Sequence, residues 1–320
     1  MFFFEISCVF LIFFPIFAKK SGYNMYNIII PVIYRDFSFL KKSIKYVHMN
    51  LMPDKIYIIT DIRFRRFLPK EIKSDEKCVV VDENKVIEGL NKEALELLFR
   101  KLNRTRMGVG WYFQQFLKMA FALSAYCNTD YYLSWDSDTI PLRNIDFFNE
   151  KGKPYFTMKS EHHAPYFVAI ERLLGITKTN SRSYIAENMM FNKSIMINLI
   201  NRIQSNNQLI GNTWFEKIVY AIEPETVSPM GFSEFETYGN YCFNYYPDFY
   251  VERMLPSFRE GGLIQGRFIS DRILKQLSFD QTMASFEIYD RPPFPWGRLS
   301  YWYARWQRRK ELFIRRWLFR

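Results

Sequence analysis

Apolar runs that alternate with helical segments most constrain the fold of this chain. Continuous apolar runs, typical of strands buried on both faces, occur at residues 28–33, 55–60, 78–81 and 131–135. Segments with helical periodicity lie between them, at residues 37–51 and 111–126. Strands spaced by helices indicate a parallel sheet, so we expect an α/β protein with a Rossmann-like, mostly parallel sheet flanked by helices.

The composition indicates a globular chain with an anionic partner. Hydrophobic residues make up 48% of the 320 residues and aromatic residues 19%, which excludes a disordered chain. The formal net charge of +11 favours nucleotide phosphate, acidic lipid or nucleic acid as a partner. The 4 cysteines show neither metal-ligand spacing nor a pairing pattern, which fits a reducing, cytosolic setting. Only 3 histidines are present, which argues against histidine-based zinc chemistry.

The first 24 residues form an apolar segment with three open interpretations. The uncharged run from Ile6 to Ala18 is shorter than the ~20 residues that a membrane-spanning helix needs. Two lysines follow this run, whereas a signal peptide carries its positive charge before it. A marginal anchor, an interfacial segment, or residues upstream of a true start at Met25 all fit. We therefore set residues 1–24 apart from the domain that follows.

Polar residues after the apolar runs mark the expected ligand site, because ligands of open α/β sheets bind at the carboxyl ends of strands. Asp136 and Asp138 follow the run at 131–135. In an extended backbone their side chains would point the same way, about 6–7 Å apart. Such a pair suits a hard divalent cation that bridges to a phosphate. A simple turn is the alternative, because Asp, Ser and Thr before Pro commonly form one.

The segment before this pair supplies basic and helical candidates. Residues 100–110 combine basic side chains with two glycines that open a helix, which could form a phosphate site at the helix N-terminus. Along the helix, Trp111, Gln115 and Lys118 share one face. A mid-helix lysine is commonly just solvated, but this shared face favours a role for Lys118 beside the aspartate pair.

Two later segments carry further candidates. The polar loop at 159–166 contains His162 and His163, which either contact substrate hydroxyls or are merely exposed. Residues 184–191 predict another strand, which carries Glu187 and Asn188.

A predicted helix start at Ser233 carries two glutamates. Ser233 and Glu236 match the S-x-x-E capping box, which gives Glu236 a structural explanation. Glu234 is not used by that motif. The helix macrodipole favours its ionised form, and a general base must be ionised. An exposed glutamate in the first helical turn is the alternative.

Residues 291–320 differ from the rest of the chain because they combine arginine with 4 of the 7 tryptophans. On a helix, Trp302, Trp306, Phe313 and Trp317 would lie within about 60° of one another. A tryptophan stripe backed by arginine is typical of a helix in an anionic membrane interface. Packing against the domain would explain the stripe but not the arginine excess. No nucleic-acid-binding motif accompanies it, so we expect a membrane-contacting tail and no nucleic-acid partner.

Five short motifs, IIIPV, QQFLK, WDSD, ENMMF and FSEFETYGNY, occur in this order within residues 25–290. Their order resembles bacterial glycosyltransferases of the GT-A fold with an Asp-x-Asp motif, from capsule and lipopolysaccharide biosynthesis clusters. The resemblance implies a GT-A-like, mixed but mostly parallel sheet in a catalytic domain at residues 25–290. It also implies a hexosyltransferase-like enzyme that uses a nucleotide-sugar, of the UDP-sugar type, and a surface-polysaccharide or lipid-linked glycan acceptor. Such an enzyme would be cytoplasmic and peripheral to the inner membrane.

The resemblance also implies a role for each candidate residue. Asp136 and Asp138 would hold Mn²⁺ or Mg²⁺ and the donor ribose, and Glu234, or else Glu236, would deprotonate the acceptor hydroxyl. The other implied contacts are donor contacts from Arg35, Asp36, Gln115 and Lys118, and sugar contacts from His162, His163, Glu187 and Asn188. A base favours inversion at the anomeric carbon. In many related enzymes a late histidine is the third metal ligand, but no histidine follows His163.

Two other functions remain open. A nucleotidyl- or phosphotransferase would use the same metal–phosphate chemistry, although we would expect more carboxylates than the one clear pair. A non-enzymatic adaptor that binds a membrane or RNA would depend on residues 291–320 and would tolerate the loss of Asp138.

Overall fold

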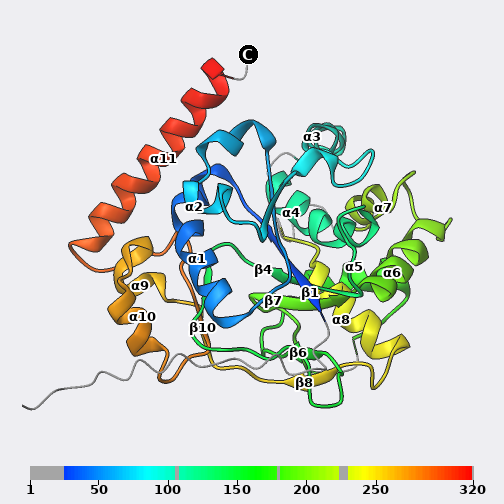
Figure 1. Ribbon diagram of the computed structural model, residues 1–320. Coiled ribbons are helices and arrows are strands. Elements are labelled where there is room, and N and C mark those ends of the chain that lie inside the picture. The colour runs from blue at the N-terminus through cyan, green and yellow to red at the C-terminus, as the bar shows by residue number, and fades with distance from the viewer. Residues whose placement is uncertain (1–24, 105–107, 179–180, 223–229, 319–320) are drawn as a thin grey trace, which may run out of the picture.

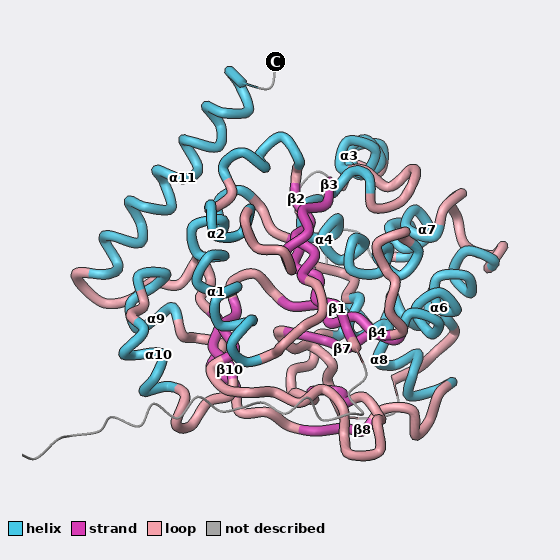
Figure 2. Tube along the Cα trace, in the orientation of Figure 1, coloured by secondary structure: helices cyan, strands magenta, loops and turns pink. Residues whose placement is uncertain are grey.

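A five-stranded sheet forms the centre of the computed structural model, which describes residues 25–104, 108–178, 181–222 and 230–318. The apolar segment at 1–24 lies outside these residues. The strand order is β3-β2-β1-β4-β7. These strands are β1 (Tyr26–Pro31), β2 (Ile56–Thr60), β3 (Cys78–Asp82), β4 (Tyr131–Trp135) and β7 (Asn188–Asn192). Figure 2 shows them as magenta segments in the middle of the molecule, with helices around them.

Four of the five strands are parallel. Strand β1 pairs in parallel with β2 and β4, and β2 pairs in parallel with β3. Only β7 is antiparallel, and it pairs with β4. The predicted fold class, a mixed but mostly parallel sheet flanked by helices, is therefore confirmed.

Two hydrophobic cores cover the two faces of the sheet, because alternate side chains of each strand point to opposite faces. Ile28 and Ile30 of β1 belong to one core with helix α1 (Phe37–Asn50), whereas Ile29 belongs to the other with helix α4 (Val109–Ala120). All three isoleucines are fully buried, as the continuous apolar run predicted. Figure 1 shows α1 and α4 on opposite sides of the sheet.

The other helices continue these two layers. The α4 side also holds α3 (Lys92–Lys101), α5 (Ala164–Leu174), α6 (Lys193–Ser205), α7 (Trp214–Ala221) and α8 (Glu234–Tyr245). The α1 side includes α2 (Lys70–Lys73), whose Ile72 is buried in the same core. Helices α9 (Gly262–Gln265) and α10 (Asp271–Leu277) lie beside this layer in Figure 1.

Two small sheets extend the edge of the domain. In one, β5 (Thr139–Pro141) pairs antiparallel with β10 (Met283–Ser285), which also pairs with β9 (Ser257–Phe258). In the other, β6 (Tyr155–Thr157) pairs with β8 (Val251–Arg253). Because β5 directly follows the aspartate pair, its pairing with β10 brings a late part of the chain to that pair.

Two predicted elements are shorter in the structure. The helix expected at 111–126 ends at Ala120, and a 3₁₀ turn follows at Phe121–Leu123. After this turn, the hydroxyl of Ser124 donates to the carbonyl of Phe121 at 2.7 Å. The strand expected at 184–191 begins only at Asn188. The backbone N–H of Tyr184 donates to a glutamate side chain instead of to a neighbouring strand.

The C-terminal helix α11 (Trp296–Leu318) runs along one side of the domain (Figure 1). Ile314 anchors it, because its side chain is 2% exposed and belongs to the core beneath α1. Tyr303 adds a hydrogen bond to Ser38. Within the described residues, no helix combines the length and the apolar character that crossing a membrane requires.

Candidate active site at the carboxyl edge of the sheet

Asp136 and Asp138 lie in a turn between β4 and β5. The strand ends at Trp135, and the N–H of Thr139 donates to the carbonyl of Asp136 at 3.1 Å, which closes the turn. The expectation that the pair continues an extended strand is therefore wrong, because the two aspartates lie in a turn. Trp135 stabilises the turn, because its indole N–H donates to the carbonyl of Thr139 at 2.9 Å. The pair remains at the carboxyl edge of the sheet.

Lys118 links this turn to helix α8. Its ammonium group lies 3.0 Å from Oδ1 of Asp136 and 3.0 Å from Oε1 of Glu234, and its side chain is only 6% exposed. Burial by itself would lower the pKa of Lys118, but the two carboxylates more than offset this and raise it. Lys118 is therefore a buried cation between two anions, on the helix face that the sequence predicted.

Gln115 holds the same glutamate from one helical turn away. Its side-chain oxygen accepts a hydrogen bond from the N–H of Glu234 at 3.1 Å. Because Glu234 is the first residue of α8, this bond satisfies a backbone donor that the helix itself leaves free. Helix α4 thus positions Glu234 through both its main chain and its carboxylate.

Glu236 has a different environment from Glu234. Ser233 caps its N–H at 3.2 Å, as predicted, but the carboxylate does not complete the capping box. Instead, Oε1 accepts hydrogen bonds from the hydroxyl of Ser183 at 2.8 Å and the N–H of Tyr184 at 2.9 Å. Oε2 accepts one from Asn240 at 3.0 Å. One oxygen of this fully buried carboxylate therefore holds the segment that precedes β7, and the other binds Asn240 of the same helix.

Asp138 lies among more carboxylates than the sequence indicated. Its partly enclosed position and the neighbouring Asp136 raise its pKa to about 7. Arg267 opposes this shift, while Asp36 and Glu287 add to it. Arg267 also forms an ion pair with Asp36. The group around Asp138 therefore carries excess negative charge, which a bound cation would relieve.

Glu187 and Asn188 lie beside the aspartate turn, at the start of β7. The carbonyl of Glu187 accepts a hydrogen bond from the N–H of Asp136 at 3.2 Å. Its buried carboxylate accepts another from Ser257 at 3.1 Å and lies 3.5 Å from the ammonium group of Lys159. Asn188 is also buried, and its amide contacts the sulfur of Met283 at 3.3 Å.

Asp36 is the predicted site residue among the described lining of the pocket below, whereas Arg35, His162 and His163 make their contacts elsewhere. Arg35 turns toward helix α11 and lies 3.4 Å from the carboxylate of Glu311. His162 is exposed and stacks on Phe167. A ring nitrogen of His163 lies 2.9 Å from the carbonyl of residue 230.

The predicted phosphate site at residues 100–110 is only partly described. Residues 105–107 lie outside the described residues. Arg104 binds the carbonyls of Val219 and Ile222, so it ties this segment to α7. Gly108 precedes helix α4 as its N-cap.

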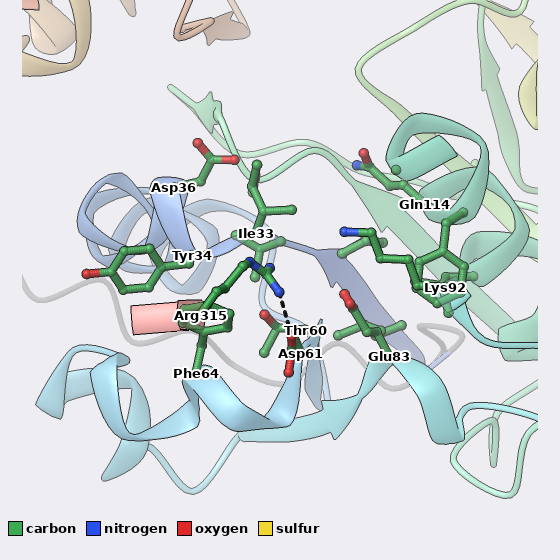
Figure 3. A pocket seen from close by; sticks show the side chains of 17 residues that line it. Ile33, Tyr34, Asp36, Thr60, Asp61, Phe64, Glu83, Lys92, Gln114 and Arg315 are labelled. Atoms are coloured by element: carbon green, nitrogen blue, oxygen red, sulfur yellow. Dashed lines mark hydrogen bonds and ion pairs between the residues drawn. The ribbon is translucent and has the colours of Figure 1, made fainter. Parts of the chain in front are cut away.

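A pocket of ≈ 100 Å³ opens at the ends of β1 and β2, next to the aspartate turn (Figure 3). The polar or charged side chains that line it are Tyr34, Asp36, Thr60, Asp61, Glu83, Lys92, Gln114, Ser137 and Arg315. These residues come from loops after the strands, from helices α3 and α4, and from the distant helix α11. Ser137, which separates the two aspartates of the turn, lines the pocket, so Asp136 and Asp138 adjoin the pocket without lining it.

Two acidic side chains give the pocket its electrostatic character. Asp61 is 5% exposed, and Arg63 binds both of its oxygens, at 2.9 and 2.8 Å. Burial opposes ionisation, yet these bonds keep the pKa of Asp61 below its ordinary value. Burial raises the pKa of Glu83 to about 7, although Lys92 acts against the shift. Asp61 and Glu83 follow β2 and β3, where the sequence showed polar strand ends.

A second cluster of three metal-type ligands lies away from this site. The ligand atoms of His48, Asp75 and Cys78 lie within 4.8 Å of one another. The sequence did not suggest this group, because its members are scattered along the chain. Asp75 already accepts hydrogen bonds from Cys78 at 3.4 Å and from the N–H of Lys77 at 2.9 Å, and lies 2.5 Å from His48. These contacts tie the end of α1 to the start of β3, at the opposite end of that strand from the pocket.

Sequence comparison places most of the chain in one family. Residues 28–246 match a family described as "Family of unknown function (DUF6492)". No curated protein matches the sequence.

Three solved structures show a distant likeness. One is the galactosyltransferase LgtC in complex with donor and acceptor sugar analogs, with 9% identity, a TM-score of 0.39, and coverage of 87% of this chain and 95% of that chain. Another is mouse xyloside xylosyltransferase 1, with 9% identity, a TM-score of 0.42, and coverage of 84% and 99%. The third is the glycosyltransferase GlyE of Streptococcus pneumoniae TIGR4, with 10% identity, a TM-score of 0.35, and coverage of 88% and 60%.

Proposed function

The chain belongs to this family of unknown function, and we propose that it is a metal-dependent glycosyltransferase. It would move a sugar from a nucleotide-sugar, of the UDP-sugar type, to a surface-polysaccharide or lipid-linked glycan acceptor. The observation that carries the proposal is the turn Asp136–Asp138 beside a strand-end pocket, joined through Lys118 to Glu234.

The side chains around the turn fit a divalent cation. Asp136 and Asp138 offer carboxylate oxygens, which Mg²⁺ and Mn²⁺ prefer. The excess negative charge around Asp138 is the second point of fit, because burial and three neighbouring carboxylates raise the pKa of this group. Asp136 and Asp138 would hold the metal, and we propose Glu287 as the carboxylate that takes the place of a late histidine. The metal, when bound, would neutralise charge that develops on the leaving diphosphate.

Lys118 and Glu234 would orient the reacting groups. Lys118 holds the carboxylate of Asp136 at 3.0 Å, which limits how that carboxylate can turn. Glu234 is the better candidate for the base that deprotonates the acceptor hydroxyl, because both oxygens of Glu236 already accept hydrogen bonds, one from Ser183 and one from Asn240. The ammonium group of Lys118 lies 3.0 Å from Oε1 of Glu234, which would limit how this carboxylate can turn. A base in this position favours inversion at the anomeric carbon.

Neighbouring residues would bind the two substrates. Asp36 and the main chain around β1 line the pocket that would take the nucleotide. Glu187 and Asn188, beside the turn, would contact the transferred sugar or the acceptor. The histidines at 162 and 163, which lie on the loop before α5, would meet only the outer part of an acceptor.

Helix α11 supports contact with an anionic membrane, where a lipid-linked acceptor would be found. The predicted stripe is exposed, at 64% for Trp302, 53% for Trp306, 59% for Phe313 and 57% for Trp317. The interpretation that this stripe packs in the core is therefore wrong. The same helix carries exposed arginines at 305, 308, 309 and 316. We propose that the enzyme works in the cytoplasm, peripheral to the inner membrane, and without a nucleic-acid partner.

A panel of nucleotide-sugars tests the proposed function. We expect the wild type to release free nucleotide from at least one of them in the presence of Mn²⁺. Asp138→Ala should lower this rate by ~100-fold or more, because the metal stabilises the charge of the leaving group. Glu234→Gln should keep donor binding but lose transfer.

Asp54→Ala is the matched control, because Asp54 is exposed and precedes β2 at the opposite edge of the sheet. It should keep wild-type activity. The proposal is wrong if no nucleotide-sugar shows metal-dependent turnover, or if Asp138→Ala is as active as Asp54→Ala.

A nucleotidyl- or phosphotransferase is the second candidate, and one observation favours it. Asp36 and Glu287 add carboxylates to the pair at 136 and 138, which is the richer set that such an enzyme would need. The products distinguish the two activities. Glycosyl transfer releases a nucleoside diphosphate, whereas nucleotidyl transfer from a nucleoside triphosphate releases pyrophosphate.

A further inference from the structure

We propose that Arg315 of helix α11 binds the nucleoside diphosphate part of the donor. The C-terminal helix would then be one wall of the donor pocket as well as a membrane-contacting element. This inference rests on the proposed function, and it assigns a donor contact to a segment that the sequence sets apart from the catalytic domain.

The packing of α11 carries Arg315 into the pocket. The preceding residue, Ile314, is 2% exposed and is fixed in the core beneath α1. On the same helix, the carboxylate of Glu311 lies 3.4 Å from Arg35 and 3.1 Å from Nε of Arg315. Figure 3 shows the guanidinium of Arg315 between Tyr34 and Asp61, pointing into the pocket. Side chains on two sides therefore hold Arg315 at this wall.

The ion pair between Arg315 and Asp61 leaves part of the guanidinium available to a ligand. The guanidinium lies 3.3 Å from Oδ2 of Asp61, a carboxylate that Arg63 already binds through both oxygens. The Arg315 side chain is 34% exposed, so part of the guanidinium remains accessible. A guanidinium has five N–H donors in a planar fork, a geometry that matches phosphate oxygens.

Arg315 adds positive charge to a pocket in whose described lining acidic side chains outnumber basic ones. Three acidic residues line the pocket, namely Asp36, Asp61 and Glu83. The basic residues among its described lining are Lys92 and Arg315. A nucleoside diphosphate carries several negative charges, so these carboxylates would repel it unless nearby cations offset them. Of these two cations, Arg315 belongs to helix α11, so deletion of that helix would remove it from the pocket.

Helix α11 would therefore serve two ligands through different faces. Arg315 and Ile314 face the domain, whereas Trp302, Phe313 and Trp317 are exposed. This separation means that the donor contact and the membrane contact can be tested independently with single substitutions in the full-length chain.

The test measures binding of UDP, GDP, CDP and ADP to the full-length protein by isothermal titration calorimetry with Mn²⁺. For the nucleotide that the wild type binds best, we expect Arg315→Ala to weaken binding by ~10-fold, the effect of losing one charge-assisted hydrogen bond. Arg315→Lys should retain part of the affinity. Arg309→Ala removes the same charge from an exposed position of α11 and should stay within about twofold.

Glu311→Gln distinguishes ligand binding from helix packing. This variant weakens the ion pairs of Glu311 with Arg35 and with Nε of Arg315 but keeps the guanidinium in the pocket, so it should bind nucleotide more tightly than Arg315→Ala. Flotation with anionic vesicles should be unchanged in Arg315→Ala.

Three results would overturn the inference while leaving the proposed function intact, provided that the wild type turns over a nucleotide-sugar. These are wild-type affinity in Arg315→Ala, an equal loss in Arg309→Ala, and an equal loss in Glu311→Gln. If the wild type neither binds a nucleoside diphosphate nor turns over a nucleotide-sugar, the proposed function fails as well.

Discussion

The carboxyl edge of the sheet and the outer face of helix α11 both reverse the usual distribution of residues. Charged side chains are normally exposed and large apolar ones buried. At the sheet edge, however, Lys118, Glu234 and Glu236 are at most 5% exposed. On α11, Trp302 and Trp317 are more than half exposed. Under the proposed function, a metal and a diphosphate would bind beside the first region, and an anionic membrane would contact the second.

The two regions differ in how they are supported. At the sheet edge, ion pairs join segments that are far apart in the chain, such as Lys118 and Glu234. Substitutions there should change both stability and activity. The exposed aromatic side chains of α11 contribute little to folding, so substitutions there should change binding to a partner and leave stability almost unaltered.

The largest expected effect comes from Lys118→Met. This change leaves the carboxylates of Asp136 and Glu234 without their shared buried cation, so it should lower the free energy of unfolding by about 3–5 kcal/mol. It should also abolish turnover, because Asp136 loses the contact that orients it. Urea unfolding and the nucleotide-release assay measure the two effects.

Lys217→Met is the control for Lys118. Lys217 is also a buried lysine, but its ammonium group donates to the carbonyls of Gln204 and Asn206 at 2.6 and 2.8 Å. Its loss should destabilise the protein by about 1–3 kcal/mol. The folded fraction should retain full activity. Equal activity in the two variants would contradict the assignment of Lys118 to the site.

A smaller effect is expected at Glu83, and it depends on pH. Burial raises the pKa of Glu83 from 4.5 to about 7 in the folded protein. The folded state therefore binds this proton more tightly than the unfolded state, so stability falls as the pH rises from about 4.5 through 7. Glu83→Gln removes this contribution. Because Glu83 is partly exposed, the gain at pH 8 relative to pH 5 should be about 1–2 kcal/mol.

Thermal melting at pH 5 and pH 8 measures the difference, with Glu88→Gln as the control. Glu88 is exposed and follows β3 by a few residues. If Glu83→Gln shows the pH dependence of Glu88→Gln, Glu83 does not contribute as described.

The smallest effect on stability is expected on the outer face of α11. Trp302→Ser combined with Phe313→Ser should leave the free energy of unfolding within ~0.5 kcal/mol of the wild type, because both side chains are exposed. Binding to phosphatidylglycerol vesicles should fall by ~10-fold or more, since each buried apolar side chain contributes about 1.5–3 kcal/mol. Flotation with these vesicles at low and high salt measures the binding.

Phe279→Ser is the control for this face, because Phe279 is 73% exposed but lies after α10. It should bind vesicles like the wild type. Unchanged flotation of the double variant would show that the stripe serves another partner.

Much of the fold follows from local patterns in the sequence. The apolar runs predicted four of the five central strands, and helical periodicity predicted α1 within one residue of its end. The antiparallel direction of β7 could not be predicted, because it depends on pairing with β4, more than fifty residues earlier. Likewise, the early start expected for that strand failed because Glu236 binds the backbone of Tyr184.

The site was predictable only where one element carries its residues. Asp136, Asp138 and Lys118 were visible because the turn and the helix face are local features. Glu287 and Arg315 gave no such signal, since they reach the site through the β5–β10 pairing and the docking of α11. Arg35 was placed at the nucleotide because it follows β1, but the structure shows it beside Glu311 instead.

The binding of a nucleoside diphosphate and Mn²⁺ to the aspartate turn is the most direct test of this account. Calorimetry should show that wild-type protein and Asp54→Ala bind the nucleotide only when Mn²⁺ is present, and that Asp138→Ala does not bind it under either condition. Nucleotide binding by Asp138→Ala with wild-type affinity and the same metal dependence would contradict the claim that this carboxylate edge is a metal–diphosphate site.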